Sequence, residues 1–106
     1  MNAKQLGLRD EDLSCIIKTL SKDPSVESII VFGSRAMGNF KPGSDIDISI
    51  KSSSANISKV ITRAKDILEN ESTIPFFFDI VHYESIDNKD LIKHIDQHGL
   101  EIYKKK

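Results

Sequence analysis

Apolar residues recur along this chain with the spacing of helical faces in three segments. The first predicted helix has Asp10 as its N-cap and ends before the Asp23-Pro24 pair, because the residue before a proline leaves the helical region. Two further helices are predicted over residues 56–69 and 88–98, the second ended by Gly99 at the C′ position. The i, i+3, i+4, i+7 stripe of the first helix consists of Leu13, Ile16, Ile17 and Leu20.

Four other segments carry the patterns of strands. Residues 26–32 are rich in β-branched side chains, and we expect their apolar end to be buried on both faces. Residues 45–50 alternate strictly between polar and apolar, which predicts a strand with three isoleucines facing the core. Residues 76–81 predict a third strand, and the alternating residues 100–103 predict a short strand at an edge of the sheet.

The order of these elements predicts an α/β (α+β) domain that covers residues 1–106. Residues 33–44 hold three of the five glycines and one of the three prolines, which is typical of a functional loop with room for one helical turn. The unit from residue 45 to residue 81 is predicted to be a right-handed crossover between parallel strands. If those strands are neighbours, Asp79 lies beside Asp45 and Asp47 on one face of the sheet.

Composition and charge remove several classes of function. The chain has 106 residues, with 15 basic and 16 acidic side chains, so its net charge is 15 − 16 = −1. Stable binding to duplex DNA needs a basic surplus, which is absent. The single cysteine, Cys15, cannot form an internal disulfide, and we expect it to pack inertly. No apolar run approaches the ~20 residues of a membrane span, so we expect a cytoplasmic protein without a membrane partner.

Candidate chemistry is concentrated in two places. The α-carbons of Asp45 and Asp47 are expected to lie roughly 6.6 Å apart, so that both carboxylates can hold two divalent ions about 3.5–4 Å apart. Hard cations such as Mg²⁺ take oxygen ligands, and without them the carboxylates repel one another and raise at least one pKa. At the other place, the backbone and hydroxyl of Gly33-Ser34 can meet phosphate oxygens, with Arg35 as a further phosphate ligand.

These motifs resemble the signature of the DNA polymerase β-like nucleotidyltransferase superfamily. The resemblance consists of the run Phe32-Gly33-Ser34-Arg35, Gly38, and ten residues between Ser34 and Asp45-Ile46-Asp47, with Asp79 at the position of the third carboxylate. The pattern F-G-S-R-A-x-G ahead of S-D-I-D-I is similar to the minimal nucleotidyltransferases (MNT), which are encoded beside a helical HEPN partner, often as toxin and antitoxin. It covers about residues 26–82 by motif and the flanking helices by order.

The resemblance implies a polymerase β palm-like fold, with a mixed sheet of three to four strands flanked by helices. It also implies an enzyme that uses two Mg²⁺ ions, with Mn²⁺ as a substitute, to move AMP from ATP to a tyrosine hydroxyl of a HEPN toxin. An acceptor would be presented by that partner or by a second copy of this chain. The implied roles are metal binding and catalysis for Asp45, Asp47 and Asp79, and nucleotide binding for Gly33, Ser34, Arg35 and Ser44.

Other interpretations of the same residues stay open at this stage. The chain departs from the MNT pattern at Met37, where a second basic residue is common. The fold could serve as a binding module that neutralises a helical partner without catalysis, or as a nucleotide or metal sensor. Arg35 could pair with a surface carboxylate instead of phosphate. For the remaining candidates, we expect solvated side chains at His94 and His98, a structural role for His82, and a core role for the 76–78 phenylalanines.

Overall fold

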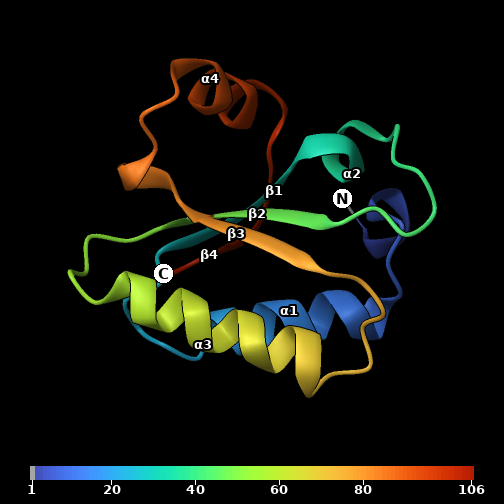
Figure 1. Cartoon of the computed structure of the whole chain (residues 1–106), viewed down its shortest axis with the longest axis horizontal. Coiled ribbons are helices and arrows are strands. Elements are labelled where there is room, and N and C mark those ends of the chain that lie inside the picture. Colours follow the sequence, from blue (N-terminus) through green and yellow to red (C-terminus); the bar gives the residue numbers. More distant parts are fainter. Residues whose placement is uncertain (1) are drawn as a thin grey trace.

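A mixed sheet of four strands organises the structure, a computed structural model that describes residues 2–106. Its strands are β1 (Ser28–Phe32), β2 (Ile46–Lys51), β3 (Phe78–His82) and β4 (Leu100–Lys104), in the order β3-β2-β1-β4 (Figure 1). The sheet is mixed because β1 runs antiparallel to β2 and β4, whereas β2 and β3 are parallel. The parallel pair and the edge position of the last strand are as the sequence predicts.

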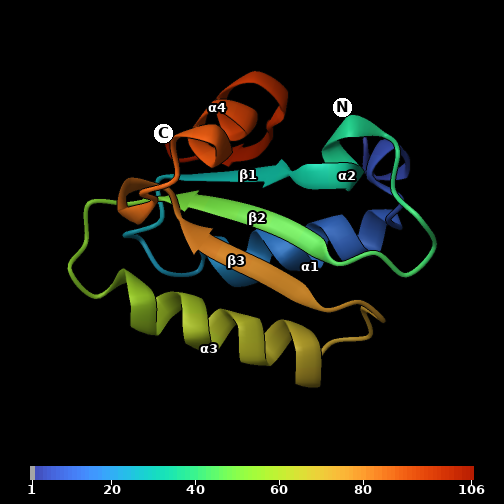
Figure 2. The same ribbon diagram turned by 45° about the horizontal axis from the view of Figure 1, so that its top comes forward.

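Helices cover both faces of this sheet. Figures 1 and 2 show α1 (Asp10–Ser21) and α3 (Ile57–Asn70) along one face and α4 (Lys89–His98) across the other. A short helix, α2 (Gly33–Met37), follows β1 directly, so the 33–44 loop does contain one helical turn. Two 3₁₀ turns, η1 (Ala3–Leu6) and η2 (Tyr83–Ser85), complete the elements within residues 2–106. None of the helices in this part of the chain is long and apolar enough to cross a membrane.

The main core lies between the sheet and the helix pair α1 and α3. The three isoleucines that alternate along β2, Ile46, Ile48 and Ile50, are completely buried in it, as the period-two pattern predicts. All five residues of β1 are buried too. A second, smaller cluster lies under α4, where Ile95 packs with Ile30 and Phe32. Since α4 is a single short helix, it covers only part of its face of the sheet.

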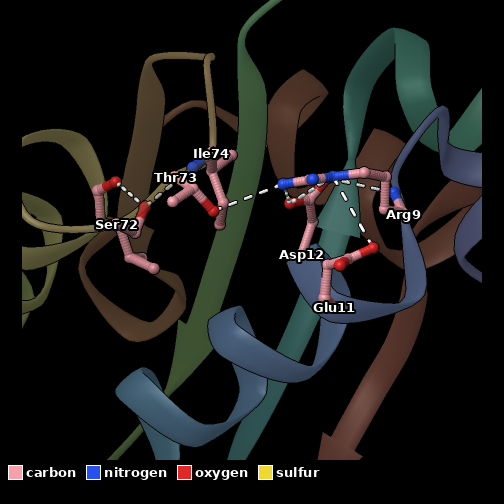
Figure 3. A network of polar contacts seen from close by, with 7 residues as sticks. Arg9, Glu11, Asp12, Ser72, Thr73 and Ile74 are labelled. Atoms are coloured by element: carbon pink, nitrogen blue, oxygen red, sulfur yellow. Dashed lines mark hydrogen bonds and ion pairs between the residues drawn. The ribbon is translucent and has the colours of Figure 1, made fainter.

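The start of α1 differs from the prediction. Its N-cap is Arg9, not Asp10, which instead lies in the first helical turn. The reason is the carboxylate of Asp12, which accepts hydrogen bonds from the Arg9 backbone N–H at 3.1 Å and from its Nη2 at 2.8 Å. Arg9 Nη2 also donates to Thr73 Oγ1 at 3.4 Å, which links α1 to the segment that leads into β3 (Figure 3).

The end of α4 also differs in detail. The helix ends at His98, but the Gly99 backbone is extended, with φ −65° and ψ 145°, and is not the left-handed C′ glycine that we expected. A Cβ at this position would collide with the carbonyl oxygen of Ile95 and with the side chain of Ile30. Glycine is therefore required by close packing where the chain turns directly into β4.

The phenylalanine run before β3 divides among three environments. Phe78 is buried in the main core, in agreement with its predicted role, and Phe76 is half-buried against Arg35. Phe77 is 70% exposed, so the expectation that the whole run is core is wrong. The difference arises because β3 begins only at Phe78 and lies at an edge of the sheet, so that Phe77 precedes the strand.

Candidate functional site

Three carboxylates gather at one end of the sheet, on the face that α4 partly covers. Asp47 of β2 and Asp79 of β3 are direct register partners in the parallel pair. Asp45 lies two residues before Asp47, just ahead of β2. Asp47 is half-buried, whereas Asp45 and Asp79 are exposed. The crossover thus places Asp79 beside the other two, as expected for neighbouring parallel strands.

The charges of these groups act on Asp47. Burial and the negative charges of Asp79 and Asp45 raise the pKa of Asp47, and the positive charge of Arg35 partly opposes this rise. All three side chains offer carboxylate oxygens, the donors that hard divalent cations take, so the donor set fits Mg²⁺ or Mn²⁺. Within residues 2–106 the side chains do not already converge into a cluster of three metal-binding groups. A cation held among them would relieve the repulsion that raises the pKa of Asp47.

Gly33 brings the backbone after β1 against this carboxylate group. Phe32 of β1 and Asp47 of β2 are register partners. Gly33 follows Phe32 as the first residue of α2, with φ 74°. A Cβ on Gly33 would collide with Asp47 Oδ2. Both the left-handed backbone and the close approach therefore require glycine. The hydroxyl of the next residue, Ser34, has no hydrogen-bond partner in the described part of the chain.

Arg35 is only 2% exposed and does not present its guanidinium to a ligand. Its Nη1 donates to the carbonyl oxygen of Leu6 at 2.9 Å, and its Nη2 donates to that of Ser44 at 2.6 Å. The guanidinium carbon lies 4.3 Å from the ring centre of Phe76 and 5.2 Å from that of Phe40. This arrangement supports neither phosphate contact nor a surface ion pair, because the donors are used to hold the backbone.

Ser44 also has a local structural contact. Its hydroxyl donates to the carbonyl oxygen of Lys41 at 2.8 Å and accepts the Lys41 N–H at 3.0 Å. This closes the turn that delivers the chain to Asp45. Of the four residues expected to bind nucleotide, Gly33 therefore approaches Asp47 and Ser34 follows it with an unpaired hydroxyl within residues 2–106, whereas Arg35 and Ser44 support the loop.

His94 belongs to the site, and the expectation that it is solvated is wrong. The Gly33 N–H donates a hydrogen bond of 2.9 Å to His94 Nε2, across the space between β1 and α4. The available signal was the position of His94 beside Ile95 and three residues after Leu91, on the helix face that packs on the sheet. His98 is exposed. His82 hydrogen-bonds the Ser52 carbonyl at 2.7 Å, which confirms its structural role.

This combination of fold and residues defines a class of protein. A mixed sheet carries one carboxylate on β2, a second just ahead of that strand and a third on its parallel neighbour, with Gly33 close to the first of them. The sequence model of the family described as "Polymerase beta, Nucleotidyltransferase" matches residues 14–106. The chain therefore belongs to the polymerase β-type nucleotidyltransferase family.

Solved structures of similar fold include toxin–antitoxin complexes. The chain is similar to the toxin–antitoxin MntA–HepT in a mutant form, with a TM-score of 0.70, 20% identity, and coverage of 89% of this chain and 74% of that one. For a toxin–antitoxin complex with AMP-PNP the TM-score is 0.66 at 23% identity, covering 89% and 74%. For the tri-AMPylated Shewanella oneidensis HEPN toxin with its MNT antitoxin it is 0.67 at 21% identity, covering 90% and 71%. No curated protein sequence matches the chain.

Proposed function

We propose that this chain is a metal-dependent protein adenylyltransferase that moves AMP from ATP to a hydroxyl of a HEPN-type partner, as the antitoxin of a toxin–antitoxin pair. The observation that carries the proposal is the approach of Gly33 to Asp47, beside Asp79. It brings a turn suited to phosphate within reach of carboxylates suited to metal. Membership of the nucleotidyltransferase family supports the reaction class.

In the proposed reaction each residue has a separate task. Asp45, Asp47 and Asp79 would hold Mg²⁺, or Mn²⁺ in its place, which when bound supplies positive charge to the phosphates and to the attacking oxygen. Gly33 lets the phosphates approach the backbone because it has no side chain, and the Ser34 hydroxyl donates to a phosphate oxygen. Asp79 accepts the proton of the acceptor hydroxyl. That oxygen then bonds to the α-phosphorus, and the bond from this phosphorus to pyrophosphate breaks.

The partner in this proposal is inferred from the solved complexes. One of them is a tri-AMPylated HEPN toxin in complex with an MNT antitoxin, and another is a toxin–antitoxin with AMP-PNP. Since the carboxylate end of the sheet is only partly covered by α4, an acceptor hydroxyl presented by another protein, or by a second copy of this chain, could reach Asp79. We propose that the pair meets in the cytoplasm.

The direct test uses ATP labelled on the α-phosphate, Mg²⁺, and a HEPN-type partner or an extract of the source cells. The native chain should transfer label to one protein. In the Asp45→Asn and Asp47→Asn variants the rate of this transfer should be at least about 100-fold lower. The matched control is Asp66→Asn, an exposed aspartate on α3 behind the opposite face of the sheet. Full activity in either site variant would contradict the metal roles.

A second outcome would favour the binding module. If a variant with both Asp45 and Asp47 replaced still forms a stable complex and inhibits the partner, neutralisation does not need transfer. Binding of Mg²⁺-ATP with neither transfer nor a partner would instead favour a sensor. Each result requires a folded variant, which its circular dichroism and unfolding midpoint would establish.

A further inference from the structure

The contact between His94 and Gly33 joins two parts of the molecule that are far apart in sequence. His94 Nε2 lies 2.9 Å from the Gly33 backbone nitrogen. An amide N–H can only donate, so Nε2 accepts with its lone pair and the imidazole proton is on Nδ1. The contact is therefore a specific hydrogen bond with a defined tautomer.

Packing around α4 determines where the His94 imidazole lies relative to Gly33. Ile95, the next residue of α4, is 2% exposed and packs on Ile30 and Phe32. The His94 ring meets the Phe32 ring edge to face, with centroids 6.0 Å apart and an angle of 76° between the planes. Because α4 is anchored on the sheet in this way, the position of Nε2 is set by packing and not by a mobile side chain.

On the other side of the contact, Gly33 is the first residue of α2, where backbone N–H groups lack helical partners. His94 satisfies the first of these groups, and the same turn leaves the Ser34 hydroxyl without a partner in residues 2–106. The hydrogen bond thus constrains the turn in which an added Cβ at Gly33 would collide with Asp47.

We infer that His94 is a positioning residue of the transfer site: it holds the Gly33-Ser34 turn in the orientation that receives the nucleotide phosphates. This inference rests on the proposed function, because it assigns that site a residue on α4. His94 acts through Gly33 and is not itself in contact with the reacting atoms. The chemistry it needs is a hydrogen-bond acceptor at the Nε2 position.

The experiment compares His94→Ala, which removes the acceptor, with His94→Gln, whose amide oxygen can occupy the Nε2 position. The matched control is Gln97→Ala, on the same helix α4, where the side chain is exposed. Affinity for Mg²⁺-ATP should fall about tenfold in His94→Ala, equivalent to about 1.4 kcal/mol. The affinity should stay within about twofold of native in His94→Gln and Gln97→Ala. Equal affinity in His94→Ala, or tighter binding because phosphate competes with the imidazole for the Gly33 N–H, would overturn the inference.

A second measurement separates this inference from the proposed function. Hydrogen exchange of the Gly33 amide, followed by NMR without nucleotide, should be faster in His94→Ala and close to native in His94→Gln. If the native chain binds no Mg²⁺-ATP, the proposed function fails and so does the nucleotide role of His94, but the exchange data still decide whether His94 holds the turn. If the Gly33 amide exchanges at the native rate in His94→Ala, His94 does not hold the turn. Should His94→Ala not fold, His94→Leu keeps the bulk beside Phe32 without an acceptor.

Discussion

The carbonyl oxygen of Ser44 accepts two hydrogen bonds from the guanidinium of Arg35, at 2.6 Å from Nη2 and 3.2 Å from Nε. Ser44 immediately precedes Asp45, so the buried guanidinium ties the start of the carboxylate strand to α2. Through Leu6 it also ties both to the N-terminal turn. The fork geometry is essential here, because a lysine ammonium cannot make these bonds together.

Arg35→Lys is therefore expected to lower the free energy of unfolding by about 1.5–3 kcal/mol, the range for hydrogen bonds to a charged group. Urea unfolding followed by circular dichroism measures this loss. Arg63→Lys, at an exposed position of α3, is the matched control and should change little. If Arg35→Lys has the native unfolding midpoint but binds Mg²⁺-ATP more weakly, Arg35 contacts phosphate and does not support the fold.

Gly33→Ala should reduce both stability and nucleotide transfer. An alanine there must adopt φ 74°, at a cost of about 1–2 kcal/mol, and its Cβ must also displace the Asp47 carboxylate. Gly38→Ala separates these effects, because Gly38 has a similar φ of 79° but nothing within 4 Å of an added Cβ. We expect the melting temperature to fall further for Gly33→Ala, with transfer lost only there. Equal losses in both variants would mean that the contact with Asp47 is unimportant.

Asp47→Asn should raise the melting temperature of the ligand-free protein by a few degrees at pH 7. Burial and two neighbouring carboxylates raise the pKa of Asp47, so the folded state holds its proton more tightly than the unfolded chain does. Ionisation therefore costs stability. This cost is absent below the ordinary aspartate pKa of about 3.9 and complete above the raised value.

Thermal unfolding across pH tests this sign. The advantage of Asp47→Asn should shrink as the pH falls toward the ordinary value, and Asp66→Asn should show no such trend. With Mg²⁺ and ATP the native chain should have the higher melting temperature of the two, since only the native chain gains stability from the ligand. A destabilised ligand-free Asp47→Asn variant would contradict the prediction.

Asp12→Asn should lower the stability of the protein at pH 7, in contrast to Asp47→Asn. The carboxyl of Asp12 is 3% exposed, and the hydrogen bonds from Arg9 lower its pKa. The ionised form therefore stabilises the fold above about pH 3.9, and this stability is lost as the pH falls through the lowered pKa. At pH 7 the variant should lose about 1–2 kcal/mol of unfolding free energy.

The control for Asp12 is Asp10→Asn, an exposed aspartate in the same helical turn. Urea unfolding at pH 7 and near pH 3 compares the two variants with the native chain. A loss for Asp12→Asn that does not diminish in acid would show that packing, and not ionisation, is responsible.

Local patterns in the sequence were sufficient for most of the fold. Alternation along residues 45–50 predicted which side of β2 is buried, and the crossover rule placed Asp79 beside Asp47. Two of the errors concern contacts between distant segments. Arg35 finds its acceptor at Leu6, and His94 finds its donor at Gly33, pairs that no periodicity connects. Arginine and histidine beside a phosphate-binding motif look the same in sequence whether they meet a ligand or the protein backbone.

The parallel pairing of β2 with β3 has a consequence for how the site assembles during folding. Asp47 meets Gly33 as soon as β1 pairs with β2, a contact between residues only 14 positions apart (47 − 33). Asp79 arrives only when the chain has closed the longer loop through α3, a step with a larger entropy cost. A ligand shared by all three carboxylates would therefore favour the sheet that includes β3 over the β1–β2 pair alone, so binding of such a ligand would report that the parallel pair has formed.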